Sequence, residues 1–498
     1  MSLDVATPTP PLYAQIAHRM AHLIDGQVFK VGQRLPSVRD LAAQNGVSVS
    51  TAVQALQWLE ERRLVTARPK AGYFVAPRGK SPALPAVSRP PRHSLVVERR
   101  YRTELLGEPF AERTQVSFGG ACPKDPTFFD DDRVRVALTR AARVHRHSLI
   151  EYTDSAGTAA LRAAVARRAL HLGCQLQADD IVITSSCMHA VTLCLRAVTQ
   201  PGDVVALESP THFGFLDLLE SLSLRALEIP THPRHGLSLE ALQLALDTQP
   251  VKAVLAVPTL SNPLGAVMRH ADKRALVELL AQRRIPLIED VVFNDLLAND
   301  ERRKAVKAFD TEGGVMVCGS FSKTVAPGLR LGWVAPGRWK DAVTSLKRVQ
   351  GGTTNVVLEQ ALADLLSQGG YETRMRRLST LMRERLAEAR LLINDTFPRG
   401  TRVSAPASGY TLWVELPEHL DAMTLFRRCA LEGITFGPGA LFSASDRFQH
   451  CLRLSIAGPW GEVEHRALAR VGALAQTMCA EACALEAPDE PSLVSAMH

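Results

Sequence analysis

Apolar residues near the N-terminus recur at the spacing of amphipathic helices in three short stretches, residues 12–24, 37–45 and 49–63. Ser37 can cap the second stretch, and Asn45-Gly46 predicts a tight turn before the third. Two short helices joined by such a turn form a helix-turn-helix, whose second helix enters the major groove of DNA. The string LVTARPKAGYFV then predicts a β-hairpin wing with cations at its tip. A helical bundle with an ordinary hairpin is the alternative that this pattern leaves open.

From about residue 115 onward, short apolar runs alternate with longer amphipathic stretches rich in Ala, Leu and Arg. The short runs predict strands at residues 181–184, 204–207, 253–257, 286–288 and 315–318. The longer stretches predict helices at residues 158–170, 190–198, 239–246, 271–283 and 372–392. This alternation is typical of an α/β fold with a mostly parallel sheet covered on both faces. Active sites in such folds lie at the carboxyl ends of the strands.

The chain has 498 residues, of which 46% are hydrophobic and 22% are charged. These values predict a globular protein of at least two domains and exclude a mainly disordered chain. No apolar run approaches the roughly 20 residues of a membrane-spanning helix, and the N-terminus lacks a signal-peptide pattern. We therefore expect a cytoplasmic protein without membrane association. Nine scattered cysteines form no CxxC or zinc-type cluster, so we expect reduced thiols and no metal site.

The net charge of +7 is distributed unevenly along the chain. Residues 1–102 carry 15 Lys and Arg against 6 Asp and Glu, a charge of +9, and the remainder carries 43 against 45, a charge of −2. A local excess of cations is the electrostatic footprint of a module that binds nucleic acid, although ordinary solvated charges give the same count.

Five prolines between residues 77 and 91 indicate an extended linker that divides the chain. We predict a winged helix-turn-helix DNA-binding domain over residues 1–76 and a proline-containing basic linker over residues 77–114. A large domain follows over residues 115–485, and a flexible tail over residues 486–498.

The end of one predicted strand carries several reactive side chains. In VMVCGSFSKTVAPGLRLGWV, the strand is followed by Ser320, Ser322, Lys323 and Arg330. A desolvated lysine among hydroxyls and an arginine is suited to form a Schiff base beside an anchored phosphate. An ordinary loop lysine gives the same string.

Two further strands end in polar residues. Asn262 follows the strand in AVLAVPTLSNPLG, and Asp290 ends the strand in IPLIEDVVFNDL, where a carboxylate could pair with a pyridinium nitrogen. Each alone has a simpler explanation, an Asx turn for Asn262 and a helix cap for Asp290. Taken together, the carboxylate, amide, hydroxyls, arginine and lysine describe a site for pyridoxal 5'-phosphate.

The string GQRLPSVRDLAAQNGVSVSTAVQALQWLEERRLVTARPKAGYFV strongly resembles the winged helix-turn-helix of GntR-type bacterial repressors. The resemblance implies contacts with double-stranded operator DNA from residues of the LPSVR turn, the recognition helix and the wing: Arg34, Ser37, Arg39, Ser50, Thr51, Lys70 and Gly72. The family often has Arg where this chain has Val49, so one possible phosphate or base contact is missing.

Roughly residues 115–475 resemble the fold-type I aminotransferases of the aspartate aminotransferase-like class, which bind pyridoxal 5'-phosphate. The resemblance implies that Lys323 forms the internal aldimine, that Asp290 pairs with the pyridine nitrogen and that Asn262 bonds the phenolate oxygen. It implies phosphate contacts from Ser320, Ser322, Arg330 and the Ser186-Cys187 turn, and a stacking contact from His212. It further implies that Arg453 binds a substrate α-carboxylate and that Tyr152 reaches a phosphate across a dimer interface.

Two residues depart from the pattern of these aminotransferases. Phe293 stands where a tyrosine that bonds the phenolate oxygen is usual, and His212 stands where Tyr, Trp or Phe is usual. Both departures favour cofactor binding with reduced or altered catalysis.

A GntR-like domain joined to an aminotransferase-like domain resembles the MocR-type regulators. The resemblance implies a homodimer that binds DNA under the control of an amino acid or vitamer effector, sensed through the Lys323 aldimine, with at most residual or half-reaction transamination. Two alternatives stay open. One is an active aminotransferase with an accessory DNA-binding domain, and the other is a non-catalytic reader that binds the vitamer itself as corepressor.

Overall fold

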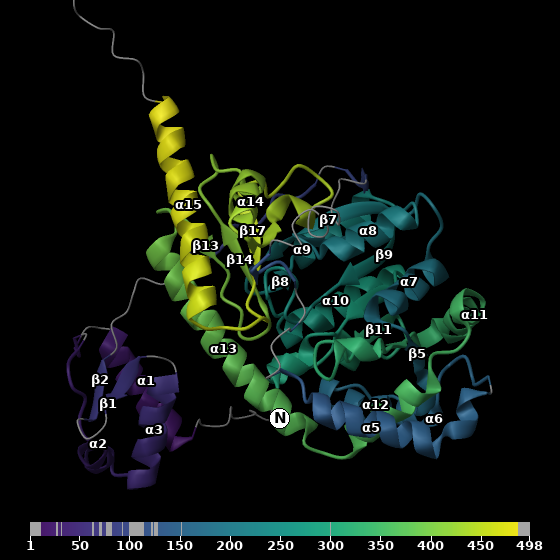
Figure 1. Ribbon diagram of the computed structural model, residues 1–498, viewed down its shortest axis with the longest axis horizontal. Coiled ribbons are helices and arrows are strands. Elements are labelled where there is room, and N and C mark those ends of the chain that lie inside the picture. Colours follow the sequence, from purple (N-terminus) through teal and green to yellow (C-terminus); the bar gives the residue numbers. More distant parts are fainter. Residues whose placement is uncertain are drawn as a thin grey trace, which may run out of the picture. The chain divides into compact units, whose positions relative to one another are not determined.

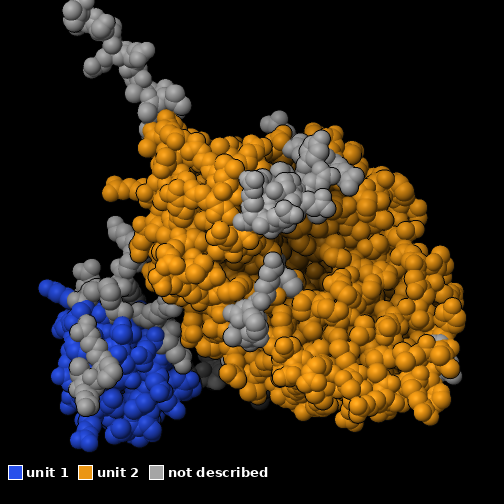
Figure 2. Space-filling model, in the orientation of Figure 1, with its two compact units in different colours: residues 1–81 blue, residues 82–498 orange. Residues whose placement is uncertain are grey.

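In the computed structural model the chain forms two compact units, Met1–Ser81 and Pro82–His498 (Figure 1, Figure 2). The structure describes residues 11–25, 28–30, 32–61, 64–68, 72–75, 82–91, 93–98, 114–120, 123, 128–150, 152–298 and 300–486. Within these residues, no helix has both the length and the apolar content to cross a bilayer.

The small unit is a winged helix-turn-helix, as predicted. It contains helices α1 (Leu12–Asp25), α2 (Val38–Asn45) and α3 (Val49–Glu61), followed by the antiparallel strands β1 (Val65–Arg68) and β2 (Gly72–Val75). Leu41, Leu56, Leu59 and Val75 are buried in a core to which all these elements contribute. The apolar spacing in the sequence therefore accounts for this unit.

The turn between α2 and α3 depends on local capping. The Ser37 hydroxyl accepts from the Asp40 N–H at 3.2 Å, and the Asp40 carboxylate accepts from the Ser37 N–H at 3.3 Å, which is a capping box. At the other end of α2, Gly46 has φ 62° and its N–H donates to the Ala42 and Ala43 carbonyls. Glycine adopts this left-handed conformation without steric strain, so the turn follows from the sequence.

The large unit is built on a nine-stranded sheet in the order β3-β7-β6-β9-β10-β11-β12-β5, with β8 paired to β7. The central pairings, from β7 through β6, β9 and β10 to β11, are parallel. Strand β12 pairs antiparallel with β11 on one side and with β5 on the other, so β5 runs in the direction of the central strands. The predicted mostly parallel sheet is therefore confirmed. The strands are β3 (Leu95–Val96), β5 (Val182–Thr184), β6 (Val204–Ser209), β7 (Arg225–His232), β8 (Gly236–Leu237), β9 (Val251–Ala256), β10 (Leu287–Asp290), β11 (Val315–Ser320) and β12 (Gly332–Ala335).

Helices surround this sheet and bury it (Figure 1). Helix α7 packs against β9 to β12 and β5, and α11 packs on the outside of α7. The remaining helices of this part include α9 and α10, which follow β8 and β9, and the neighbouring helices α5, α6 and α12. Their bounds are α5 (Asp131–Val144), α6 (Ala159–Ala169), α7 (Cys187–Val198), α8 (Phe213–Ser221), α9 (Leu239–Thr248), α10 (His270–Arg283), α11 (Lys340–Gly351) and α12 (Val356–Ser367).

The C-terminal part of the large unit has its own apolar core beneath a second, antiparallel sheet. Its strands run in the order β13 (Arg402–Val403), β14 (Thr411–Glu415), β17 (Cys451–Ser455) and β16 (Gly437–Pro438). A parallel pair, β4 (Val116–Ser117) with β15 (Ile434–Thr435), lies beside it. The helices are α13 (Tyr371–Thr396), α14 (Ala422–Leu431) and α15 (Glu462–Glu486), of which α13 and α15 pack together (Figure 1).

Part of the segment predicted as a linker contacts the large unit. The Ala86 N–H donates to the Glu415 carboxylate at 3.0 and 3.1 Å, Ala83 bridges Arg402, and β3 pairs with β7 at the edge of the main sheet. The first of these contacts is that of Ala83, and the large unit begins at Pro82. Residues 99–113 lie outside the described residues, and the proposed domain limits stay a prediction.

Candidate functional site

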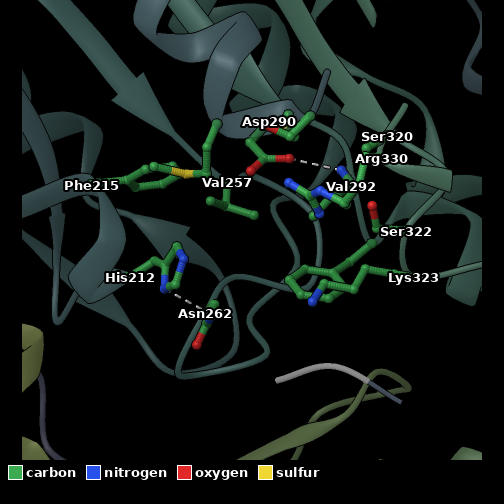
Figure 3. A pocket seen from close by; sticks show the side chains of 14 residues that line it. His212, Phe215, Val257, Asn262, Asp290, Val292, Ser320, Ser322, Lys323 and Arg330 are labelled. Carbon is green, nitrogen blue, oxygen red and sulfur yellow. Dashed lines mark hydrogen bonds between the residues drawn. The ribbon is translucent and has the colours of Figure 1, made fainter. Parts of the chain in front are cut away.

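Nine of the residues predicted to bind a cofactor line one cavity of about 170 Å³ in the large unit (Figure 3). They come from several strand ends and their following loops: Ser186, Cys187, His212, Asn262, Asp290, Ser320, Ser322, Lys323 and Arg330. The other described residues of the wall are apolar, and they include Phe215, Val257, Val292 and Phe293. The cavity therefore combines polar groups of both charges with an apolar surface that suits a flat ring.

The parallel strands place the polar groups. Asp290 is the last residue of β10, and its register partner on β11 is Cys318, two residues before Ser320. Lys323 follows in the loop after β11, and Asn262 lies in the loop after β9. Because parallel strands end at the same edge of a sheet, these side chains meet although their positions differ by up to about 60 residues.

Asp290 is the buried anion of the cavity. One carboxylate oxygen accepts from the Val292 N–H at 2.8 Å, and the carboxyl group also interacts with the Cys187 thiol and the Lys323 ammonium. Burial raises the pKa of Asp290 to about 6, although these three groups lower it. The same burial and the nearby Asp290 raise the pKa of the Cys187 thiol well above its ordinary value. A cationic N–H group bound beside Asp290 would favour its ionised form.

Donors for an anion gather on the β11–β12 side of the cavity. Ser320, Ser322 and Arg330 lie there, together with the first turn of α7, whose leading N–H groups have no acceptor within the helix. Ser186 caps α7 by accepting from the His189 N–H at 3.0 Å. This set of hydroxyls, a guanidinium and helix N–H groups fits a phosphate.

The close approach of β12 to this turn requires a glycine. A Cβ atom added at Gly332 would lie 2.4 Å from the Ser186 carbonyl carbon and 2.8 Å from the Cys187 nitrogen. Gly332 therefore keeps space for the turn that begins α7.

His212, Asn262 and Arg453 form a chain of polar contacts on another side. The Asn262 Nδ2 and His212 Nδ1 atoms are 3.4 Å apart, and Arg453 Nη1 donates to Asn262 Oδ1 at 3.3 Å. Burial, Arg453 and Lys323 lower the pKa of His212 to about 3, so the imidazole is neutral and its Nδ1 can accept the amide N–H.

Arg453 is fully buried but does not line the cavity. It donates to the Gly119 carbonyl and to Asn262, and its guanidinium lies 5.0 Å from the centroid of the Phe442 ring. Its Nε has no partner among the described residues. Burial lowers the pKa of Arg453 to about 10. An anionic group that reached Arg453 would thus meet a strongly desolvated cation.

Tyr410 is a site residue that the sequence analysis missed. Its hydroxyl donates to the Lys323 carbonyl at 2.7 Å, and its ring meets the Phe293 ring edge to face at 6.0 Å. Arg374 supports the same loop, because its Nη2 donates to the Thr324 carbonyl at 2.5 Å. Both residues are more than 45 positions from Lys323, and nothing in their local sequence indicates these contacts.

Tyr152 lies outside the cavity, and its side chain is fully exposed. Its predicted role across a dimer interface stays a prediction. Within the described part of the chain, no group of three or more His, Cys, Asp or Glu side chains is arranged to hold a metal ion.

Six of the seven residues predicted to contact DNA lie in the described part of the small unit, and Lys70 lies outside it. Arg39 is exposed on α2, and a Cβ at Gly72 would lie 3.3 Å from Arg34 Nε, so Arg34 lies against the wing. Ser37 is engaged as the cap of α2. The Ser50 and Thr51 hydroxyls at the start of α3 each lie 2.8 Å from the Ser48 hydroxyl.

Comparisons with known proteins cover both units. Residues 124–471 match the model of aminotransferase class I and II, and residues 12–75 match that of bacterial regulatory proteins of the gntR family. The HTH-type transcriptional regulator YjiR of Escherichia coli is 35% identical over 92% of this chain and 98% of its own length. YdcR, a second such regulator of E. coli, is 36% identical over 93% and 99%.

The large unit also resembles a solved enzyme. LysN, an α-aminoadipate aminotransferase from Thermus thermophilus crystallised with N-(5'-phosphopyridoxyl)-L-leucine, superposes with a TM-score of 0.68 at 25% identity. The match covers 76% of this chain and 99% of LysN.

We predict that Gly332→Ala weakens binding of pyridoxal 5'-phosphate at least tenfold, because the new methyl group must displace the Ser186-Cys187 turn. Equilibrium titration of the cofactor measures the change. Gly328→Ala is the matched control, since a Cβ there meets nothing within 4 Å. Equal affinity of both variants and the wild type would contradict the assigned position of the phosphate.

The buried carboxyl predicts a pH effect on the stability of the apoprotein. Because folding raises the pKa of Asp290 from its ordinary 3.8 to about 6, stability falls as the pH rises through this range. Above it, Asp290→Asn should be more stable than the wild type by about 3 kcal/mol or less, whereas the two should converge near pH 4. Urea unfolding at several pH values measures this difference. Asp341→Asn, an exposed change on α11, is the control. A difference that does not vary with pH would refute the assigned cause.

Proposed function

This chain belongs to the MocR-type transcriptional regulators, which join a GntR-type helix-turn-helix domain to an aminotransferase class I and II domain, and we propose that its large unit senses an amino acid or a vitamer through pyridoxal 5'-phosphate held at Lys323. The observation that carries the proposal is the convergence of Lys323, Asp290 and a phosphate-type donor set on one cavity.

The residues of the cavity fit this cofactor group by group. Ser320, Ser322, Arg330 and the start of α7 would bind the phosphate, and Asp290 would accept from the pyridine nitrogen. A protonated pyridine nitrogen beside Asp290 would favour the carboxylate and so oppose the effect of burial on the pKa of Asp290. When bound, the cofactor supplies a carbonyl that reacts with amines and a ring that accepts electrons.

Further residues would position the ring. Asn262 would bond its phenolate oxygen, and the neutral His212 imidazole would lie against its face. Phe293 makes the wall apolar where related enzymes usually carry a tyrosine, and the Tyr410 hydroxyl already donates to the Lys323 carbonyl. The ring oxygen would thus have fewer donors, which favours ligand sensing over rapid turnover.

Arg453 supports an effector that carries an α-carboxylate. Its buried guanidinium contacts the cavity residue Asn262, and its Nε has no partner among the described residues. The same arginine also favours the second candidate function, an active aminotransferase, because a bidentate carboxylate contact would orient an amino acid for catalysis in the same way.

We propose that the protein acts as a homodimer that binds paired operator half-sites. Large apolar side chains are exposed on α5 and on the segment after it: Val136, Val144, Leu149, Ile150 and Tyr152. Exposed apolar groups of this kind mark an interaction surface, and a second copy would bring Tyr152 toward the neighbouring cofactor site. A monomer in sedimentation equilibrium at micromolar concentration would contradict this assembly.

Lys323→Ala tests the sensing function. The variant should lose the visible absorbance of the lysine-bound cofactor and the response of DNA affinity to amino acids, while it still binds the DNA upstream of its own gene. Absorbance and fluorescence anisotropy measure the two properties, with Lys340→Ala as the control. An unchanged spectrum would exclude Lys323 as the bonding residue.

The same assay separates the alternatives. Sustained transfer of amino groups from an amino acid to a 2-oxo acid, without any change in DNA affinity, would identify an aminotransferase. A change in DNA affinity on addition of pyridoxal 5'-phosphate alone would identify the vitamer as corepressor.

Arg39→Ala tests the DNA contacts. Because Arg39 is exposed on α2, its loss should weaken operator binding about tenfold and reduce the salt slope of log K by about one phosphate contact. Fluorescence anisotropy at several salt concentrations measures both values, and Arg383→Ala, a charge change on α13, is the control. Unchanged affinity and slope would show that Arg39 faces away from the DNA.

A further inference from the structure

A second hollow, of about 470 Å³, lies in the large unit between the start of α5 and the helix α13. None of the described residues that line it also lines the cavity of Lys323, and it is larger than that cavity. Its apolar surface comes from Phe128 and Phe129, just before α5, and from Leu378 and Leu381 on α13. Nothing in the proposed function uses this space.

The charge of this hollow is strongly positive. Among the described residues that line it are three arginines of α13, Arg374, Arg377 and Arg385, and one carboxylate, that of Asp130. Asp130 is already engaged as the cap of α5, where it accepts from the Arg133 N–H at 2.9 Å. Like charges that line one partly buried hollow repel one another, and an anion bound among them would relieve this repulsion.

Two of these arginines, Arg374 and Arg385, are held in place by hydrogen bonds to backbone carbonyls. Arg385 is 9% exposed, donates through one Nη to the Gly458 carbonyl at 2.9 Å and lies 5.4 Å from the centroid of the Phe128 ring. Arg374 donates through Nη2 to the Thr324 carbonyl, whereas its buried Nε has no partner among the described residues. Burial lowers the pKa of Arg374, so this guanidinium has lost hydration that an anion could replace.

The fixed forks of arginine match carboxylates, and the walls of Phe and Leu match a flat or branched hydrocarbon body. We propose that this hollow is a second ligand site, which binds a small organic anion with an aromatic or branched body and one or two carboxylates. Binding there is noncovalent and does not require the cofactor.

The site has a direct physical connection to the loop of Lys323. Arg374 holds the Thr324 carbonyl, and the ring of Phe128 meets that of Tyr410, whose hydroxyl holds the Lys323 carbonyl. An anion that reorients Arg374 would therefore change the contacts of the loop beside the first cavity.

Isothermal titration calorimetry of the full-length, cofactor-loaded protein with isophthalate, an aromatic dicarboxylate, tests the proposal. Arg377→Glu reverses an exposed charge in the hollow, and Arg383→Glu makes the same change on the same helix outside it. We expect Arg377→Glu to weaken isophthalate binding at least tenfold and Arg383→Glu to change it less than twofold. Inorganic phosphate should bind at least tenfold more weakly than isophthalate, because it cannot use the apolar walls.

Each other result would overturn the proposal. An equal loss of isophthalate affinity in Arg377→Glu and Arg383→Glu would show that only the net charge of the protein matters. Unchanged affinity in Arg377→Glu together with loss in Arg453→Ala would place the ligand in the cavity of Lys323. Phosphate binding as tight as that of isophthalate would show a simple anion site. Circular dichroism and thermal unfolding of Arg377→Glu confirm that the variant is folded, and Arg377→Gln, which removes the charge without reversing it, should show an intermediate loss of affinity.

Discussion

The parallel register of β9, β10 and β11 is the constraint on which the cavity depends. Leu287 of β10 lies beside Val254 of β9 and Val315 of β11, so the three strands end at one edge. A slip of one residue would turn the buried side chains of a strand toward the opposite face. The apolar side chains that bury these strands therefore also determine where Asn262, Asp290 and Lys323 meet. The register that packs the sheet therefore also places the reactive side chains.

The same burial moves three ionisable groups in the direction of their neutral forms. It raises the pKa of Asp290 and lowers the pKa values of His212 and Arg453. For His212 the shift leaves a neutral ring that can accept from Asn262. For Asp290 and Arg453 the loss of hydration makes a partner of opposite charge more valuable than it would be at the surface. A ligand with one cationic and one anionic group could pair with both Asp290 and Arg453.

Which residues would meet could be predicted from the sequence where a polar residue lies at, or a few positions after, the end of an apolar run. Asp290 and Lys323 are of this kind, because the strand pattern itself places them at the edge of the sheet. The sequence could not reveal contacts that the fold creates between distant positions. The hydrogen bond from the Tyr410 hydroxyl to the Lys323 carbonyl spans 87 residues. The hollow brings together Phe128, just before α5, and Arg385 on α13. The reversed direction of β12 could not be predicted either, because an apolar run has the same pattern in either direction.

The winged helix-turn-helix was predictable for a different reason, since its apolar spacing, capping box and Gly46 turn are all local. A residue whose role is to contact another molecule has no comparable local pattern in the sequence. The binding roles of all the predicted site residues therefore stay predictions, including those of Tyr152 and Lys70.

The buried carboxyl of Asp290 has a consequence for the amount of protein in a cell. The cavity removes water from a carboxylate and holds it with a lysine and an arginine. This desolvation makes the protein without a ligand less stable than the ligand-bound protein. Any ligand that binds only the folded state stabilises it by RT ln(1 + [L]/Kd), and proteases remove the unfolded chain continuously. With the proposed cofactor as that ligand, scarcity of the vitamer would shorten the lifetime of the regulator itself. The steady-state copy number would then report vitamin supply through degradation, in addition to any signal that passes through the DNA.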